Sequence, residues 1–205
     1  MKKRSHGFTL MELMITLALA AAIIGIGVPS YREFSRNSRM ISVANDLLGG
    51  IQTARTEAIK RQVLTGGVAL CPSADPIADN PACMSDATRQ FNGWIVFVDA
   101  NNNCTREDGE AVLRVGARID LQNTPTHHVN SYSNGACMSF AATGFMRTDT
   151  GRLTATQTVI CDERGNQKQP GMELSVARGV DVTSTGRARV TRDPTELSGW
   201  TTKCP

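Results

Sequence analysis

The chain has 205 residues, of which 20% are charged and 5% aromatic, and its formal net charge is +3. Lys2, Lys3 and Arg4 account for all of that charge, because the remaining basic and acidic residues balance. Bulk charge therefore gives no indication of a polyanion partner, and any contact with nucleic acid must depend on a local cluster. The length fits one domain with an appendage.

The N-terminal segment differs in composition from the rest of the chain. Residues 8–28 contain three polar residues, Thr9, Glu12 and Thr16, and follow a short basic stretch. As a helix, these 21 residues would extend about 31 Å, enough to cross the hydrocarbon core of a bilayer. The basic residues place the start of the helix in the cytoplasm. The run predicts a single-pass membrane segment.

Glu12 is the unusual residue in this run. A lone carboxylate inside a bilayer costs several kcal/mol, which a plain membrane anchor leaves unexplained. No A-x-A-like cleavage site bounded by polar residues follows the run, so an ordinary secretory signal does not fit. An unpaired buried charge selects for a partner of opposite sign.

The N-terminal stretch GFTLMELMITLALAAAIIGIGVPSY resembles the prepilin leader of type IV pilins and type II secretion pseudopilins. The matching residues are Gly7 before the cut, Phe8 after it, and Glu12 four residues further on. The resemblance implies that a prepilin peptidase cleaves after Gly7 and that the new N-terminus at Phe8 is methylated. It also implies that Glu12 faces the terminal amine of a neighbouring subunit and sets the register of filament assembly.

An amphipathic helix is predicted over residues 29–62. Apolar residues recur there at steps of three and four, and basic residues lie mostly off that stripe. Pro29 removes a backbone donor and predicts a kink near Gly25 and Gly27. We expect the apolar stripe to pack on a sheet. It consists of Phe34, Ile41, Ala44, Leu48, Ile51 and Ala58.

Residues 63–205 have the pattern of a β-rich domain. Short β-prone segments alternate with turn signals, which is typical of antiparallel sheet. One long helix, transmembrane and then amphipathic, followed by strands indicates an α+β fold with the helix packed on antiparallel β-sheets. The predicted boundaries are 1–7, 8–28, 29–62 and 63–205. The expected strands lie within 63–70, 93–99, 111–119, 127–133, 137–143, 153–162, 171–177 and 180–190.

Six cysteines lie beyond the apolar segment, and none forms a C-x-x-C pair. An even, dispersed set in an exported domain indicates three disulfides, with free buried thiols as the alternative. It also places the domain in an oxidising space such as a periplasm. Six cysteines allow 15 pairings, among which the spacing does not choose. Cys71 and Cys83 end a long polar loop, and we expect a local bridge between them.

The globular part has a family likeness of its own. Four segments together resemble the GspH/FimT group of minor pilins and pseudopilins: GWIVFVDANNNCTREDGEAVLR, SFAATGFMR, VICDERG and LSVARGVDVTSTGRARV. The resemblance implies a type IV pilin-like fold, with a long N-terminal helix against two β-sheets. Cys104 stands where the group usually has glycine, which suggests an extra bridge to Cys137. The bridge Cys161–Cys204 would then tie the tail to the sheet, as the final disulfide loop does in many pilins.

The loop DANNNCTREDGE has the oxygen-ligand spacing of a calcium-binding EF-hand loop. The sixth place, which needs glycine for its turn, is Cys104, and the flanks read as strands. The alternative, which we favour, is a tight hairpin turn without metal, since Asn and Asp tolerate left-handed geometry. The calcium ligands would be Asp99, Asn101, Asn103, Glu107 and Glu110.

Signatures of catalysis are missing from the sequence. It has no G-x-S-x-G motif, no P-loop and no dinucleotide fingerprint. His127 and His128 are neighbours, so on a strand they point to opposite faces and do not easily share a metal. The sequence therefore predicts a protein that is not an enzyme and has no cofactor.

A local cluster of positive charge lies near the C-terminus, where residues 164–203 hold seven basic residues against four acidic ones. Arg187 and Arg189 are two apart, so on a strand they project from one face, and guanidinium groups match phosphate oxygens. The motif GRAR at Gly186 resembles the GRxR element of FimT-type minor pilins, which capture DNA for natural transformation. The expected DNA-binding residues are Gly186, Arg187, Arg189, Arg192 and Lys203, the last two on charge alone.

Two functional hypotheses follow. In the first, the chain is a minor pilin that binds double-stranded DNA without sequence specificity. In the second, it is a structural or priming pseudopilin of a type II secretion system, and its arginines pair with Asp181, Asp193 or Glu196. Both place it in the inner membrane with a periplasmic C-terminal domain, and then in a filament with other pilins that extends towards the cell surface.

Overall fold

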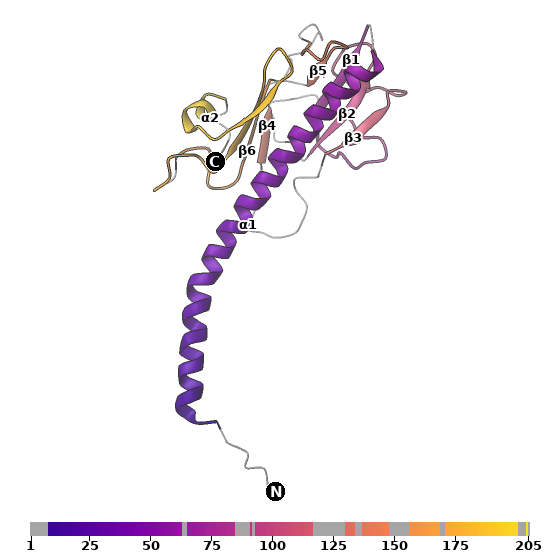
Figure 1. The fold of residues 1–205 in the computed structure, drawn as a ribbon. Helices are drawn as coiled ribbons and strands as arrows, with labels where there is room; N and C mark the ends of the chain where they lie inside the picture. The colour runs from indigo at the N-terminus through magenta and orange to yellow at the C-terminus, as the bar shows by residue number, and fades with distance from the viewer. Residues whose placement is uncertain are drawn as a thin grey trace. The chain divides into compact units, whose positions relative to one another are not determined.

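The computed structural model describes residues 8–62, 65–84, 91, 93–116, 130–133, 137–147, 156–168, 171–200 and 204. Within them the chain forms two helices and two four-stranded sheets (Figure 1). It divides into two compact units, Met1–Ser38 and Arg39–Pro205. In chain order the elements are α1 (Leu10–Arg61), β1 (Gly67–Ser73), β2 (Gly93–Asp99), β3 (Val112–Val115), β4 (Asn130–Ser133), β5 (Met138–Phe140), β6 (Gln157–Cys161), β7 (Arg178–Val182), β8 (Ala188–Thr191) and α2 (Pro194–Trp200).

The first unit is the apolar part of α1. Thr9 caps the helix, because its hydroxyl accepts a bond from the Glu12 N–H and its carbonyl one from the Leu13 N–H, each at 3.2 Å. This part of α1 is long and apolar enough to cross a membrane, and its most apolar stretch is not buried within the chain. The helix continues through Pro29, and the kink predicted there stays a prediction.

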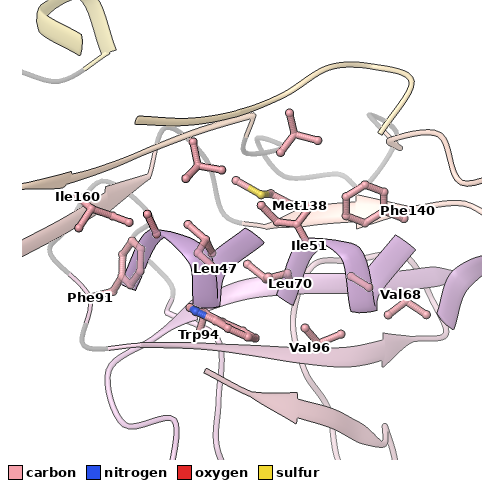
Figure 2. Packing of buried hydrophobic residues seen from close by; sticks show 14 of the residues in the cluster. Leu47, Ile51, Val68, Leu70, Phe91, Trp94, Val96, Met138, Phe140 and Ile160 are labelled. Carbon is pink, nitrogen blue, oxygen red and sulfur yellow. The ribbon is translucent and has the colours of Figure 1, made fainter. Parts of the chain in front are cut away.

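The second unit is built around a buried stripe of α1. The stripe packs on side chains from both sheets, among them Leu70 of β1, Trp94 of β2 and Ile160 of β6 (Figure 2). The predicted arrangement, a long helix packed on antiparallel sheets, is confirmed. The stripe consists of Met40, Ala44, Leu47, Gly50, Ile51, Ala54 and Ala58.

The buried face of α1 follows the predicted stripe in part, because Ala44, Ile51 and Ala58 are buried and Leu48 packs against the core. Phe34 is 70% exposed and Ile41 is 45% exposed, although both were expected in the stripe. Small residues such as Gly50 and Ala54 are buried in their place, because a small side chain lets the sheet approach the helix axis. The buried face therefore combines large apolar residues, Met40, Leu47 and Ile51, with small residues that allow a close approach.

Both sheets are antiparallel throughout. The first has the order β3-β2-β1-β5 and the second the order β4-β6-β7-β8. β1 and β2 are buried on both faces: Val68 belongs to the cluster around α1, while its neighbour Ala69 belongs to a second cluster on the outer face. This explains why GWIVFVD is a continuous apolar run instead of an alternating one.

Disulfides fasten the outer layers of the two sheets. Cys71–Cys83 and Cys104–Cys137 lie in the cluster on the outer face of the first sheet. Cys161–Cys204 lies in a third cluster, where Leu197 and Trp200 of α2 pack on the second sheet. These are the three pairs expected above; Cys71–Cys83 and Cys161–Cys204 tie a loop and the tail to strands, and Cys104–Cys137 ties a loop to the residue before β5.

The short helix α2 has no counterpart among the predicted elements. Asp193 caps it, since its carboxylate accepts a bond from the Thr195 N–H at 2.8 Å. Pro194 occupies the first helical position, where a missing N–H is not needed. The sequence D-P-T-E carries this start signal, although no helix was predicted there.

Residues 171–177, which were expected as a strand, form bends instead. Ser175 makes an isolated bridge with Lys168, and its N–H bonds to the carbonyl of Arg192 at 2.9 Å. Met172 and Leu174 are exposed, whereas Val176 and Ala177 are buried, so only the end of this segment faces a core. The pairing of β7 with β6 in the second sheet begins at Arg178.

Trp94 packs directly against the backbone of α1. A Cβ added at Gly50 would lie 2.5 Å from Cη2 of Trp94, whereas a Cβ added at Gly49 would meet the flexible end of Arg114 at 3.0 Å. The Arg114 guanidinium lies over the Trp94 ring at 5.4 Å and bonds to Asp46 of α1 at 3.0 Å. Glycine is therefore required at position 50 but not at position 49.

We expect Gly50→Ala to destabilise the protein by about 1–3 kcal/mol, because overpacking against Trp94 outweighs the gain of about 1 kcal/mol in helix propensity. Gly49→Ala is the matched control, and we expect it to be neutral or stabilising by up to about 1 kcal/mol. Urea unfolding of the full chain in a nonionic detergent, followed by tryptophan fluorescence, measures both. Equal stability of the two variants would contradict the contact.

Candidate functional site

The N-terminal processing region lies partly within the described residues. Gly7 is outside them, and Phe8 and Glu12 are exposed. Within the part of the chain that the structure describes, the Glu12 carboxylate has no hydrogen-bond partner. Its position near the start of an exposed apolar helix leaves it available to a group from another molecule.

The turn between β7 and β8 carries the predicted DNA-binding motif. The Gly186 N–H bonds to the Thr183 carbonyl at 2.8 Å, and the Thr183 N–H to the Arg187 carbonyl at 3.0 Å. The Arg187 N–H also donates to the Thr183 hydroxyl at 3.2 Å. Gly186 has φ +77°, and a Cβ there would lie 2.3 Å from the carbonyl oxygen of Gly144. Position 186 therefore requires glycine for two reasons, backbone conformation and close approach.

Arg187 and Arg189 have different surroundings. Arg187 is exposed, and its guanidinium makes no ion pair with any described residue. Arg189 bonds to Asp181 at 3.1 Å and to Glu196 at 3.4 Å. The pairing with Asp181 follows from the register of β7 and β8, which places the two residues opposite each other. Hydrogen bonds with Asp181 and then Glu196 raise the pKa of Arg189.

The other predicted site residues do not join this motif. Arg192 donates from Nε to the Ser175 carbonyl at 2.9 Å and is partly buried. Lys203 lies outside the described residues. Arg178, which was not predicted, is 7% exposed and donates to the carbonyls of Val176 and Ala177. Burial, with repulsion from Arg192 and Arg164, lowers the pKa of Arg178 to about 10.

Arg55 of α1 lies against the same turn, although it was not among the predicted site residues. Its Nε donates to the Gly144 carbonyl at 3.2 Å and lies 3.3 Å from the Cβ position of Gly186. The loop 141–147 also bonds to the turn, from the Met146 N–H to the Ser184 carbonyl at 2.9 Å. Charge on the amphipathic helix was the only signal for Arg55, and that signal is shared by other basic residues.

The Asn-rich loop satisfies its own acidic groups. Asp99 is fully buried and accepts bonds from the N–H groups of Asn103 and Cys104 at 3.0 and 2.9 Å. Glu110 accepts from the Ala100 N–H, and Glu107 accepts from the amide groups of Asn101 and Asn103. The oxygens that a calcium ion would need are thus used as turn caps.

Cys104 occupies the place at which a calcium loop has glycine. Its φ is +57°, in the left-handed region that glycine adopts most easily. The bond from its N–H to Asp99 and the bridge to Cys137 hold that conformation. Among the described residues no group of three or more His, Cys, Asp and Glu is placed to hold a metal ion. His127 and His128 lie outside them.

The chain has an apolar helix long enough to cross a membrane, and the later part of the same helix packs on two antiparallel sheets. These features define a pilin-like protein. The family model for the type II transport protein GspH matches residues 43–191, and the model for the prokaryotic N-terminal methylation motif matches residues 2–28. The chain therefore belongs to the GspH family of pilins and pseudopilins. A search of curated proteins and a search of solved structures gave no significant match.

Family membership fixes the general role of the chain. It is a minor pilin or pseudopilin, a class of structural filament subunits. The methylation motif implies processing by a prepilin peptidase and assembly with other pilins. The apolar helix fits a protein anchored in a membrane before it enters the filament.

We expect Asp99→Ala to destabilise the protein by about 2–3 kcal/mol, because two N–H groups lose a charged acceptor in a buried place. Asp108→Ala is the matched control in the same loop. Asp108 is exposed and bonds only weakly to Asn80 at 3.3 Å, so we expect a change within about 0.5 kcal/mol. Thermal unfolding in detergent measures both.

The same unfolding experiment, repeated with millimolar calcium and with a chelator, separates a turn from a metal site. We expect the Tm of the wild type to be the same in both conditions. A Tm that rises with calcium in the wild type but not in Asp99→Ala would make Asp99 a ligand, since a bound ion stabilises the folded state.

Proposed function

We propose that this minor pilin contacts double-stranded DNA through the turn between β7 and β8 and serves DNA uptake in natural transformation. The observation that carries the proposal is Arg187, an exposed guanidinium without a carboxylate partner among the described residues. It stands beside Gly186 on a turn whose backbone is held by three hydrogen bonds. A fixed, unneutralised arginine suits a phosphate oxygen.

Arg189 is less available to a phosphate than Arg187, because it already has acidic partners. Its side chain is 51% exposed, but a phosphate must displace Asp181 and Glu196 before it can bind. Partly exposed ion pairs are worth little, so the exchange is feasible but reduces the gain. Two phosphate contacts, from Arg187 and Arg189, give a log–log salt slope of about −2. The expected binding is weak, salt-sensitive and independent of sequence.

The proposal includes the position of the chain in the cell. Residues 1–7 form the leader, 8–28 the membrane helix, 29–62 the amphipathic helix and 63–205 the domain outside the membrane. The basic N-terminus favours a cytoplasmic start and a periplasmic C-terminal domain. Three disulfides fit an oxidising compartment. Cleavage after Gly7, methylation of Phe8 and pairing of Glu12 with a neighbouring amine belong to the same proposal.

The alternative is a structural or priming pseudopilin without DNA binding. The ion pairs of Arg189 favour it, because one of the two motif arginines already has acidic partners within the fold. The description of the matching family, a type II transport protein, is consistent with it. DNA binding by the isolated subunit separates the two functions.

The test is a titration of the full chain in nonionic detergent against a labelled duplex at low salt. We expect Arg187→Ala to weaken binding by about tenfold, because it removes a charged phosphate contact. We expect Asp181→Asn to tighten binding several-fold, because it frees Arg189. Lys60→Ala and Asp108→Asn are the controls with the same changes of charge at exposed positions that are not part of the turn.

Three outcomes distinguish the functions. Loss of binding in Arg187→Ala, with both controls near wild type, supports the turn as the contact. Equal loss in Lys60→Ala would place DNA on the basic face of α1 and contradict the site. No salt-sensitive binding by the wild type or by Asp181→Asn would favour the structural pseudopilin.

A further inference from the structure

We propose that Arg55, Phe145 and Arg187 form one composite site for single-stranded nucleic acid. The Phe145 ring stacks on an unpaired base, and the two arginines hold the phosphates beside it. The inference rests on the proposed function for the role of Arg187, and it adds two residues and a preference for unpaired bases. The three residues come from α1, from the loop 141–147 and from the turn between β7 and β8.

The loop and the turn are fixed to each other at two glycines. A Cβ at Gly186 would lie 2.3 Å from the Gly144 carbonyl oxygen, so the two backbones are in direct contact. The Met146 N–H bonds to the Ser184 carbonyl at 2.9 Å on the same edge. Phe145 follows Gly144 and Arg187 follows Gly186, so the aromatic residue and the arginine flank one rigid contact.

Arg55 lies across this contact. Its Nε donates to the Gly144 carbonyl at 3.2 Å, and its Cδ lies 3.4 Å from the Cβ position of Gly186. Its two terminal nitrogens make no hydrogen bond with a described residue, and no described carboxylate pairs with it. Arg55 at the glycine contact and Arg187 next to Gly186 are therefore two arginines at one place in the fold, and neither has a carboxylate partner among the described residues.

Phe145 is an exposed aromatic residue on a rigid turn. Its side chain is 55% exposed and belongs to none of the three buried clusters. The turn is closed by bonds from the Ala141 N–H to the Phe145 carbonyl at 2.9 Å and from the Gly144 N–H to the Ala141 carbonyl at 2.8 Å. Ile59 of α1, also exposed, lies beside Gly144. Because the backbone that carries the ring is already ordered, binding a flat partner costs the ordering of the side chain alone.

The chemistry of these three residues favours a single strand over a duplex. Aromatic side chains stack on bases regardless of sequence, and cationic groups follow the backbone. In a duplex each base already stacks on its neighbours, so an exposed ring reaches a base only at an end or in an unpaired stretch. Duplex DNA can still touch Arg187 through its phosphates, which is the contact of the proposed function.

The test uses the full chain in nonionic detergent with two labelled probes, a deoxythymidine oligonucleotide and a duplex of equal length. We expect the wild type to bind the single strand more tightly. Phe145→Leu should lose about tenfold in affinity for the single strand and less than about twofold for the duplex. Phe145→Trp should keep the affinity, and the fluorescence of its new indole should be quenched by the single strand.

The arginine arm of the test uses salt dependence. Arg55→Ala should reduce the salt slope for the single strand by about 0.7, the value for one phosphate contact, whereas Arg55→Lys should preserve it. Lys60→Ala is the control: Lys60 lies further along α1 and is exposed, whereas Arg55 is partly buried, and we expect the loss of Lys60 to leave the slope unchanged. Thermal unfolding of each variant checks that the exposed substitutions leave the fold intact.

The outcomes separate this inference from the proposed function. Duplex binding that depends on Arg187, with Phe145→Leu unchanged on both probes, would overturn the composite site and leave the duplex contact standing. Single-strand binding that depends on Phe145, without duplex binding, would support the composite site and overturn the duplex proposal. If no probe binds, both fail. A filament-assembly defect in Phe145→Leu with unchanged DNA affinity would assign the ring to a subunit contact instead and overturn the inference.

Discussion

Two four-stranded sheets share one apolar partner, the buried stripe of α1 from Met40 to Ala58. Because the helix occupies their inner faces, each sheet needs other material to cover its outer face. The described residues supply short loops, α2 and the tail, and disulfides hold them there. The same stripe fixes the last turns of α1 beside the loop 141–147, so that Arg55 reaches the turn between β7 and β8. Packing of α1 in the core thus places Arg55 at the candidate site.

Periodic patterns were enough to predict the main elements of this fold. The apolar run 93–99 becomes β2 without change, because a strand buried on both faces needs no alternation. The face of α1 was predicted less well, since Phe34 attracts attention by its size whereas Gly50 is selected by the indole opposite it. Such a choice depends on a partner more than forty residues away in the sequence, Trp94, which no local pattern reveals.

The candidate site shows the same division. The motif at Gly186 was found through its resemblance to the GRxR element, and the acids able to compete for its arginines were evident from the sequence. The register of β7 and β8 decides between them: Asp181 stands opposite Arg189, while Asp193 is used to cap α2. Arg55 and Phe145 could not be added from the sequence, because only tertiary contacts between Gly144 and Gly186 bring their segments together. Site residues that lie close together in the sequence can be predicted from it, whereas a site assembled from three separate elements cannot.

The three disulfides follow one another along the chain without overlap, since each cysteine is bonded to its nearest neighbour in order: Cys71–Cys83, Cys104–Cys137 and Cys161–Cys204. Six cysteines allow fifteen pairings. In this one, a chain that crosses a membrane in the order of its sequence can close each disulfide before the first cysteine of the next pair has crossed. On the proposed route of export into an oxidising space, each second cysteine would enter when its partner is already there and unpaired. The order of the cysteines would then let export itself select the native pairs, without later exchange among them.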